Sequence, residues 1–164
     1  MRLSRFLIFA LLAPLALALG CDRGAHPAQT GRVAPDFTVS DGTSTVHLAG
    51  YRGHIVLLNF WATWCGPCVE ETPSLSKLAQ DYASKGVVVL GISVDKDPQA
   101  YQKFLSRYTP AFLTARDFKI HEEYGTFMYP ETYIIDAKGR VVLKIAEAAD
   151  WSDPKMTQYI DSLL

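Results

Sequence analysis

Two cysteines separated by two residues form the most chemically informative motif of the sequence, Trp64-Cys65-Gly66-Pro67-Cys68. The motif lies between an apolar run that predicts a buried strand and a segment that predicts a helix. Free N–H groups and the dipole at a helix N-terminus stabilise a thiolate and lower its pKa. At this spacing Cys68 can reach back to Cys65 within one turn and close a disulfide. We therefore expect redox chemistry, with Cys65 as the exposed nucleophile and Cys68 as the deeper, resolving thiol.

Other uses of a cysteine pair fit the sequence less well. A structural zinc site needs about four ligands, and the chain has neither a second C-x-x-C pair nor a closely spaced histidine pair. Covalent attachment of c-type haem needs a histidine directly after the second cysteine, where this chain has Val69. A static structural disulfide would rarely lie at a strand-to-helix junction. We therefore expect no metal and no cofactor.

A carboxylate shares the helix face of the resolving thiol. Glu71 follows Cys68 by three residues, which places both side chains on one face of a helix, whereas Glu70 points away. A carboxylate beneath a buried thiol could accept the thiol proton, directly or through water. The alternative is an ordinary solvated glutamate, which better describes Glu70.

Apolar runs and turn signals predict the elements that position these residues. Strands are expected near 36–39, 45–48, 55–60, 87–94, 111–113, 132–135 and 140–145, and helices near 65–84, 98–108, 119–124 and after 153. An Asp-Gly pair marks a hairpin turn after the first strand, and two Asp-Pro pairs mark helix starts. The order predicts an α/β domain, a mixed sheet with helices on both faces.

The first residues have the pattern of an export signal. Two arginines precede a 14-residue apolar run at 6–19, shorter than the roughly 17–25 residues of a spanning helix. Residues 1–20 are therefore expected to be a signal peptide. The Gly-Cys pair that ends at Cys21 resembles the signal of bacterial lipoproteins, in which the cysteine is lipidated. Cleavage after Ala18 is the alternative and would leave Cys21 as a free thiol.

The rest of the chain predicts a short tether, residues 21–33, and one domain, residues 34–164. The 16 basic and 17 acidic residues give a formal charge of −1, so nucleic acid is not an expected partner. A hydrophobic fraction of 49% with 20% charged residues excludes a disordered chain. Three cysteines are too few for a disulfide-stapled miniprotein. Lipidation would account for Cys21, the third cysteine, which has no place in the C-x-x-C pair.

Three stretches of the sequence resemble the TlpA/ResA/CcmG(DsbE)-like thioredoxin family. They are the motifs at 34–37 (APDF), 58–68 (LNFWATWCGPC) and 129–136 (YPETYIID). The resemblance covers about residues 33–164. It implies a thioredoxin fold with an extra N-terminal β-hairpin and an insertion between the central strand and its following helix. It also implies thiol–disulfide exchange on the periplasmic side of the cytoplasmic membrane, by a lipid-anchored protein or, alternatively, a soluble periplasmic one.

The resemblance also implies roles for single residues. Pro130 matches a cis-proline that faces the active site and leaves the backbone of Tyr129 free to pair with an extended substrate. Glu71 matches the active-site glutamate of the family. The residues expected to dock the substrate are Trp64, Tyr129, Pro130 and Glu131.

The resemblance further implies the direction of electron flow. The Gly-Pro pair between the cysteines is that of reducing thioredoxins, and Asn59 replaces their buried aspartate, which leaves Glu71 as proton acceptor. We expect reduction of disulfides in exported proteins, with oxidised apocytochrome c as the leading candidate substrate in cytochrome c maturation. A reductase in an oxidising compartment must be re-reduced. The family implies a membrane dithiol donor of the DsbD/CcdA type.

Three other functions stay open. A general periplasmic disulfide reductase or isomerase would use the same cysteines. A metal- or haem-handling lipoprotein would use the two thiols as ligands, although such proteins in this fold tend toward a C-x-x-x-C spacing. Peroxiredoxin-type peroxidases share the motif at 34–37, but they carry threonine three residues before the reactive cysteine, where this chain has Ala62.

Overall fold

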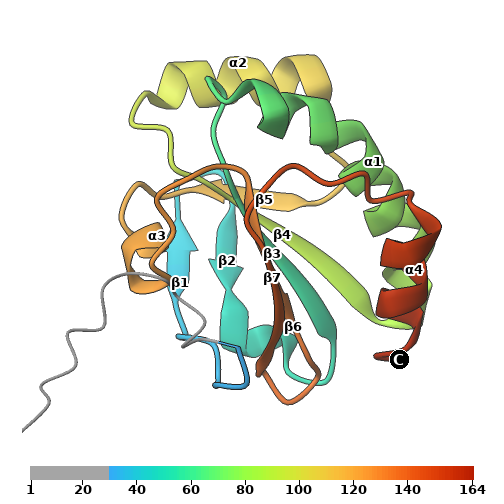
Figure 1. Ribbon diagram of the computed structural model, residues 1–164. Helices are drawn as coiled ribbons and strands as arrows, with labels where there is room; N and C mark the ends of the chain where they lie inside the picture. Colours follow the sequence, from blue (N-terminus) through green and yellow to red (C-terminus); the bar gives the residue numbers. More distant parts are fainter. Residues whose placement is uncertain (1–29) are drawn as a thin grey trace, which may run out of the picture.

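The computed structural model describes residues 30–164, and its centre is a five-stranded mixed sheet in the order β5-β4-β3-β6-β7 (Figure 1). The predicted signal peptide, Cys21 and most of the predicted tether lie outside the described residues. Strands β3, β4 and β5 run parallel to one another, and β6 and β7 form an antiparallel hairpin beside β3. The strands are β3 (Ile55–Trp61), β4 (Val87–Ser93), β5 (Leu113–Arg116), β6 (Glu131–Ile135) and β7 (Val141–Ile145).

A separate antiparallel hairpin, β1 (Thr38–Ser40) and β2 (Thr45–His47), precedes the sheet. Its turn forms at the predicted Asp-Gly pair. Gly42 has a φ of 85°, and the Asp41 carboxylate accepts hydrogen bonds from the backbone of Thr43 and Ser44, both at 2.8 Å. The extra N-terminal hairpin is confirmed.

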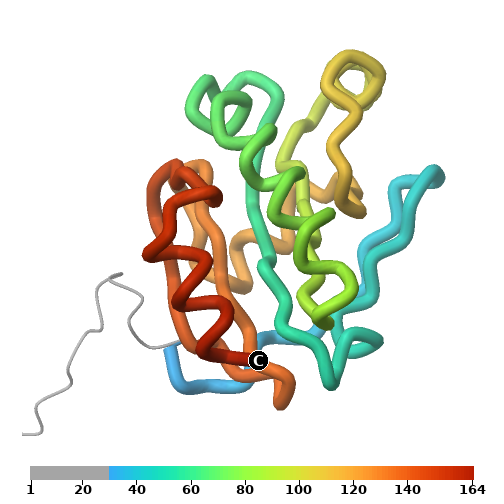
Figure 2. The backbone as a smooth tube through the Cα atoms, turned by 90° about the vertical axis from the view of Figure 1, so that its right-hand side faces the viewer, coloured from blue at the N-terminus to red at the C-terminus, as the bar shows by residue number. Residues whose placement is uncertain are grey.

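Four helices cover the two faces of the sheet, as predicted (Figures 1 and 2). They are α1 (Gly66–Tyr82), α2 (Pro98–Tyr108), α3 (Ile120–Glu123) and α4 (Pro154–Asp161), and short 3₁₀ turns occupy Leu48–Tyr51 and Ala83–Lys85. Helices α2 and α4 start at the predicted Asp-Pro pairs, where Asp97 and Asp153 each accept a backbone hydrogen bond as N-caps. None of the helices within residues 30–164 is long and apolar enough to cross a membrane.

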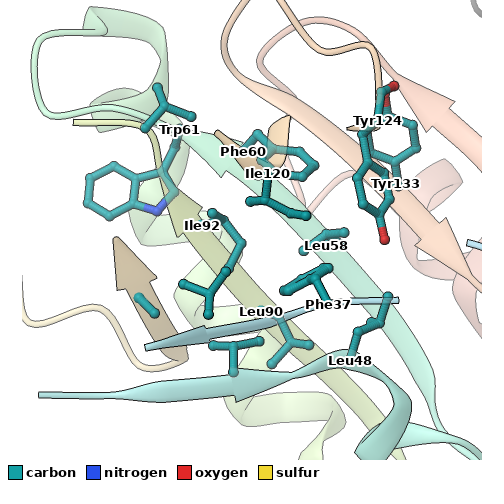
Figure 3. Packing of buried hydrophobic residues seen from close by; sticks show 14 of the residues in the cluster. Phe37, Leu48, Leu58, Phe60, Trp61, Leu90, Ile92, Ile120, Tyr124 and Tyr133 are labelled. Atoms are coloured by element: carbon teal, nitrogen blue, oxygen red, sulfur yellow. The ribbon is translucent and has the colours of Figure 1, made fainter. Parts of the chain in front are cut away.

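Two hydrophobic cores lie on opposite faces of the sheet. The first packs β3 and β4 against the β1–β2 hairpin, α2 and α3, and includes Phe60, Trp61 and Tyr124 (Figure 3). The second packs the other face against α1 and α4 and includes Leu75, Trp151 and Ile160. Strand β3 is buried along its whole length because it lies between both cores. This burial fixes the strand that leads into the cysteine motif.

The expected insertion between the central strand and its following helix is not found there, because β3 ends at Trp61 and α1 begins at Gly66; the longer excursion is the segment between β4 and α3, which contains α2 and the edge strand β5. The strand expected at 111–113 lies further along, at Leu113–Arg116. Pairing with β4 sets this position, with Leu90 opposite Leu113 and Ser93 opposite Arg116. A partner so distant in sequence leaves no signal in the local pattern.

The start of the folded domain also differs from its expected position at Ala34. Gly31 donates a hydrogen bond to the carbonyl of Val141 at 2.7 Å, and Val141 donates one to Arg32 at 2.9 Å. Val33 forms an isolated bridge with Arg140. The last residues of the predicted tether therefore belong to the domain, because they pair with the start of β7.

Candidate active site

The structure joins Cys65 and Cys68 in a disulfide at the N-terminus of α1, with their Cα atoms 5.3 Å apart. Cys65 is the N-cap of the helix, and its sulfur accepts a hydrogen bond from the backbone N–H of Cys68 at 3.2 Å. Cys65 is 6% exposed and Cys68 1% exposed. Cys65 is thus the more accessible of the two, although it is less exposed in this oxidised form than the sequence led us to expect. The free N–H groups of the first helical turn are placed to stabilise a thiolate.

Pairing of β3 with β6 brings a proline to the same end of the sheet. Phe60, near the end of β3, lies opposite Glu131, the first residue of β6. The peptide bond between Tyr129 and Pro130, just before β6, is cis. Since β3 leads directly to Cys65, the antiparallel register places Pro130 beside the cysteine loop.

Glu71 is buried, with 4% of its surface exposed, whereas Glu70 lies in solvent. One carboxylate oxygen of Glu71 accepts a hydrogen bond from the Asn59 side chain at 2.8 Å. The other accepts from the backbone of Ala149 at 3.1 Å and from the Trp151 indole at 3.3 Å. Burial raises the pKa of Glu71, and these hydrogen bonds offset part of the rise. A raised pKa suits a group that takes up and releases a proton near neutral pH.

A groove of about 350 Å³ opens to the surface beside Glu71. It lies between the first half of α1 and the segment before α4. The groove is lined by Glu70, Glu71, Pro73, Ser74, Ala148, Ala149 and Asp150.

Of the four residues expected to dock the substrate, Trp64 and Tyr129 lie together at the surface. Trp64 is 67% exposed, and its ring packs edge-on against that of Tyr129, with centroids 5.8 Å apart. Tyr129 is half-buried and Pro130 is buried.

Glu131 does not present its side chain to a substrate, contrary to the expectation from sequence. It is 3% exposed and forms an ion pair with Lys144 at 2.6 Å. It also accepts hydrogen bonds from the Thr126 hydroxyl at 2.9 Å and from the Tyr133 hydroxyl. The register that sets Tyr133 opposite Lys144 brings this cation over the strand and draws the Glu131 carboxylate inward. Glu131 therefore anchors the start of β6 from inside.

Sequence reasoning missed one buried carboxylate that holds the cysteine loop. Asp95 is 2% exposed and follows β4. It accepts hydrogen bonds from the Thr63 backbone at 2.9 Å, the Thr63 hydroxyl at 2.7 Å and the Ser93 hydroxyl at 2.6 Å. Thr63 precedes Trp64 and the nucleophile. The available signal was an aspartate directly after a strand that runs parallel to β3, because such strands end at the same edge of the sheet.

Cysteine pairs also bind metals, usually together with other His, Cys, Asp or Glu side chains. Within residues 30–164, no cluster of three or more His, Cys, Asp or Glu side chains is arranged to hold a metal ion.

Comparisons with known proteins agree with this geometry. The pattern of the AhpC/TSA family matches residues 30–144. The thiol-disulfide oxidoreductase ResA of Geobacillus thermodenitrificans is 35% identical over 136 residues, which cover 81% of this chain and 77% of that protein. The thioredoxin-like protein YneN of Bacillus subtilis is 38% identical over 139 residues, which cover 81% and 79%.

A solved structure has the same fold. The crystal structure of a Chlorobium tepidum protein, assigned as thiol:disulfide interchange protein DsbE, has a TM-score of 0.75 at 30% identity and covers 80% of this chain and 94% of that one. The disulfide at a helix N-terminus and these relatives lead to one conclusion. The chain belongs to the AhpC/TSA family of thioredoxin-like proteins and is a thiol-disulfide oxidoreductase similar to ResA and DsbE.

Proposed function

We propose that this protein reduces disulfide bonds in exported polypeptides, with Cys65 as nucleophile and Cys68 as resolving thiol. The observation that carries the proposal is the Cys65–Cys68 disulfide at the N-terminus of α1, in which Cys65 is the more exposed residue. The chemistry needs no cofactor beyond the two thiols.

The reaction starts from the reduced protein. The Cys65 thiolate attacks one sulfur of the substrate disulfide, forms a mixed disulfide and releases the other substrate sulfur as a thiolate. Cys68, as thiolate, then attacks the Cys65 sulfur, which releases the second substrate thiolate and closes the Cys65–Cys68 bond. Two electrons pass from the protein dithiol to the substrate disulfide. The structure corresponds to the oxidised product of this half-reaction.

Glu71 is the proton acceptor in the second step. Cys68 is 1% exposed, so bulk water is a poor base for its thiol. Glu71 is one turn further along the same face of α1 and is also buried. Its raised pKa makes the carboxylate a stronger base than a solvated glutamate, and the groove beside it lets the proton leave.

The proposed location is the periplasmic side of the cytoplasmic membrane. The apolar run at 6–19 and the Gly-Cys pair after it support export and lipidation at Cys21. Oxidation by the periplasm would leave the protein as the inactive disulfide, so a membrane dithiol donor of the DsbD/CcdA type would re-reduce it. The leading candidate substrate is oxidised apocytochrome c, because Pro130-Glu131-Thr132 resembles the cytochrome c maturation branch of the family.

A trapping experiment tests this function. The reduced protein is mixed with a peptide that carries the oxidised C-x-x-C-H site of an apocytochrome c, and the free thiols of the peptide are followed with time by alkylation and mass spectrometry. We expect the peptide to be reduced by the wild-type protein and left oxidised by Cys65→Ser. Cys68→Ser should accumulate a mixed disulfide between Cys65 and the peptide, visible by mass spectrometry. Reduction by Cys65→Ser, or a Cys68→Ser protein that forms no adduct, would contradict the proposal.

A further inference from the structure

The N-terminal segment joins the domain at the end of the sheet opposite to the reactive cysteines. Gly31 donates a hydrogen bond to the carbonyl of Val141, the first residue of β7, and Val141 donates one back to Arg32. Strand β3 begins at this end, at Ile55, and ends at Trp61, just before the cysteine loop. Figure 1 shows the turn between β6 and β7 at the lower edge of the molecule and the start of α1 at the upper edge.

Three segments meet at this lower end and hold one another in place. Gly53 donates a 2.9 Å hydrogen bond to the carbonyl of Ala137, and Ala34 donates one of 2.9 Å to the carbonyl of Gly139. The guanidinium of Arg52 lies over Gly139, so closely that a Cβ atom at this glycine would collide with it. We call the surface formed by these segments the base. It comprises residues 31–34, 52–53 and 137–140.

Basic side chains gather on the base, although the formal charge of the whole chain is −1. Its exposed basic residues are Arg32, Arg52, Lys138 and Arg140. One carboxylate adjoins them, that of half-buried Asp136, which accepts hydrogen bonds from the backbone of Lys138 and Arg140 at 2.9 and 2.8 Å. The salt bridges within residues 30–164 involve lysines outside the base. The base therefore presents a net positive charge to whatever faces it.

An exposed apolar side chain lies among these charges. Val33 is 55% exposed and forms the isolated bridge with Arg140. Basic side chains around an exposed apolar one are the composition with which proteins bind the surface of a membrane, because the cations meet anionic headgroups while the apolar group enters the interface.

The length of the preceding chain favours a membrane as the partner of this surface. Eight residues separate Cys21 from Thr30, and such a segment spans at most about 30 Å. A lipid on Cys21 would thus hold the base close to the membrane at a high effective concentration. Contacts that are individually weak then suffice, since each basic side chain near an anionic surface contributes about fivefold to binding.

We propose that the base docks on the anionic lipid headgroups of the membrane that carries the anchor, and so turns the reactive cysteines away from it. This inference rests on the lipid anchor proposed at Cys21 and adds an orientation to the proposed reductase. Strand β3 has seven residues, which span about 20 Å between the base and the cysteine loop. Cys65 would therefore stand clear of the headgroups and face exported polypeptides.

The test uses the full protein, exported and purified with its anchor, on vesicles of phosphatidylcholine alone or of equal parts phosphatidylcholine and phosphatidylglycerol. Flotation measures attachment, and amide hydrogen exchange read by mass spectrometry measures docking. The variant Arg32→Gln/Lys138→Gln removes two charges and keeps the pairing of the base, which uses the backbone of both residues. The matched control is Lys103→Gln/Arg107→Gln, which removes two exposed charges from α2.

We expect exchange in all three segments of the base to be slower on the vesicles with phosphatidylglycerol than on phosphatidylcholine alone, and exchange at 62–68 to be the same on both. Losing two basic side chains should weaken docking by about 25-fold, so the base variant should lose this protection, whereas the α2 control should keep it. High salt should also remove the protection.

Equal exchange of the base on both kinds of vesicle, or protection that the base variant retains, overturns the docking. A protein that floats with neither kind of vesicle overturns the docking and the lipid anchor together. The reductase function is measured separately, as reduction of a soluble peptide disulfide. The base variant should match the wild type in that assay, because its substitutions lie at the opposite end of β3, and a slower variant would contradict this separation of the base from the site.

Discussion

Asn59 on β3 donates a 2.8 Å hydrogen bond to Glu71 on α1, directly beneath the helix that carries the cysteines. The same amide nitrogen donates to the Thr132 hydroxyl on β6 at 2.9 Å. Three elements of the site are therefore joined through one amide. Because an amide cannot take up a proton, Asn59 orients the carboxylate and leaves Glu71 as the proposed base.

Glu71→Gln should slow the resolving step. We expect reduction of a peptide disulfide to fall roughly 10- to 100-fold near neutral pH, because a positioned base contributes at least this much. The loss should shrink as the pH rises past the ordinary thiol pKa of about 8.5, where Cys68 ionises without help. The matched control is Glu70→Gln, which changes the exposed neighbour on the same helix. A loss that is equal at every pH would show that Glu71 acts only in packing.

The raised pKa of Glu71 also predicts how stability depends on pH. The folded protein binds this proton more tightly than the unfolded chain, so the contribution of Glu71 to stability is greatest below the ordinary carboxyl pKa and is lost as pH rises through the raised value. The stability of the oxidised wild type minus that of oxidised Glu71→Gln should therefore fall between about pH 4 and about pH 8. Urea unfolding at both pH values measures the difference; a difference that grows with pH would contradict the assignment.

Asp95→Asn should loosen the loop before the nucleophile. The amide keeps one acceptor oxygen but turns an NH₂ group toward the Thr63 donors, so we expect a loss of about 1–3 kcal/mol in unfolding free energy. Trp64 emission should change as well, because Trp64 follows Thr63. Asp97→Asn is the control, since asparagine is an equally good N-cap. Equal stability of the two variants would show that the hydrogen bonds from Thr63 to Asp95 do not stabilise this loop.

Gly91 in β4 lies where any side chain would press on neighbouring residues. A Cβ atom at this position would lie 2.9 Å from the Phe112 ring and 3.0 Å from both the Thr114 hydroxyl and the Trp61 indole nitrogen. Gly91→Ala should therefore destabilise the protein by about 1–3 kcal/mol, as overpacking does. Gly66→Ala, whose Cβ would meet nothing within 4 Å, should show no such loss in thermal unfolding. A stable Gly91→Ala protein would mean that the neighbouring rings can move aside.

Most of the fold could be predicted because its signals are local. The Asp-Pro pairs located the starts of α2 and α4, and the apolar run at 55–60 located β3. Strand β5 was misplaced because its position is set by pairing with β4, through contacts such as Leu90 with Leu113. The pairing of Gly31 with Val141 was missed for the same reason.

The site residues also separate into those with a local sequence signal and those placed by contacts distant in sequence. Spacing alone distinguished Glu71 from Glu70, because a helix has a known period. The inward turn of Glu131 depends on Lys144 of the adjacent strand, and the role of Asp95 depends on Thr63 in another loop. The ring contacts of Tyr129 join it to Trp64, just before α1, and to His121 on α3, so only the folded chain brings these rings together.

The reduction potential of the Cys65–Cys68 pair tests the central claim most directly. It is measured in purified protein carrying Cys21→Ser, so that no third thiol exchanges, after equilibration in dithiothreitol and glutathione buffers. A protein that reduces exported polypeptides should have a potential near that of thioredoxin, about −270 mV. A potential near that of the strong oxidant DsbA, about −120 mV, would mean that the protein donates disulfides and would contradict the account.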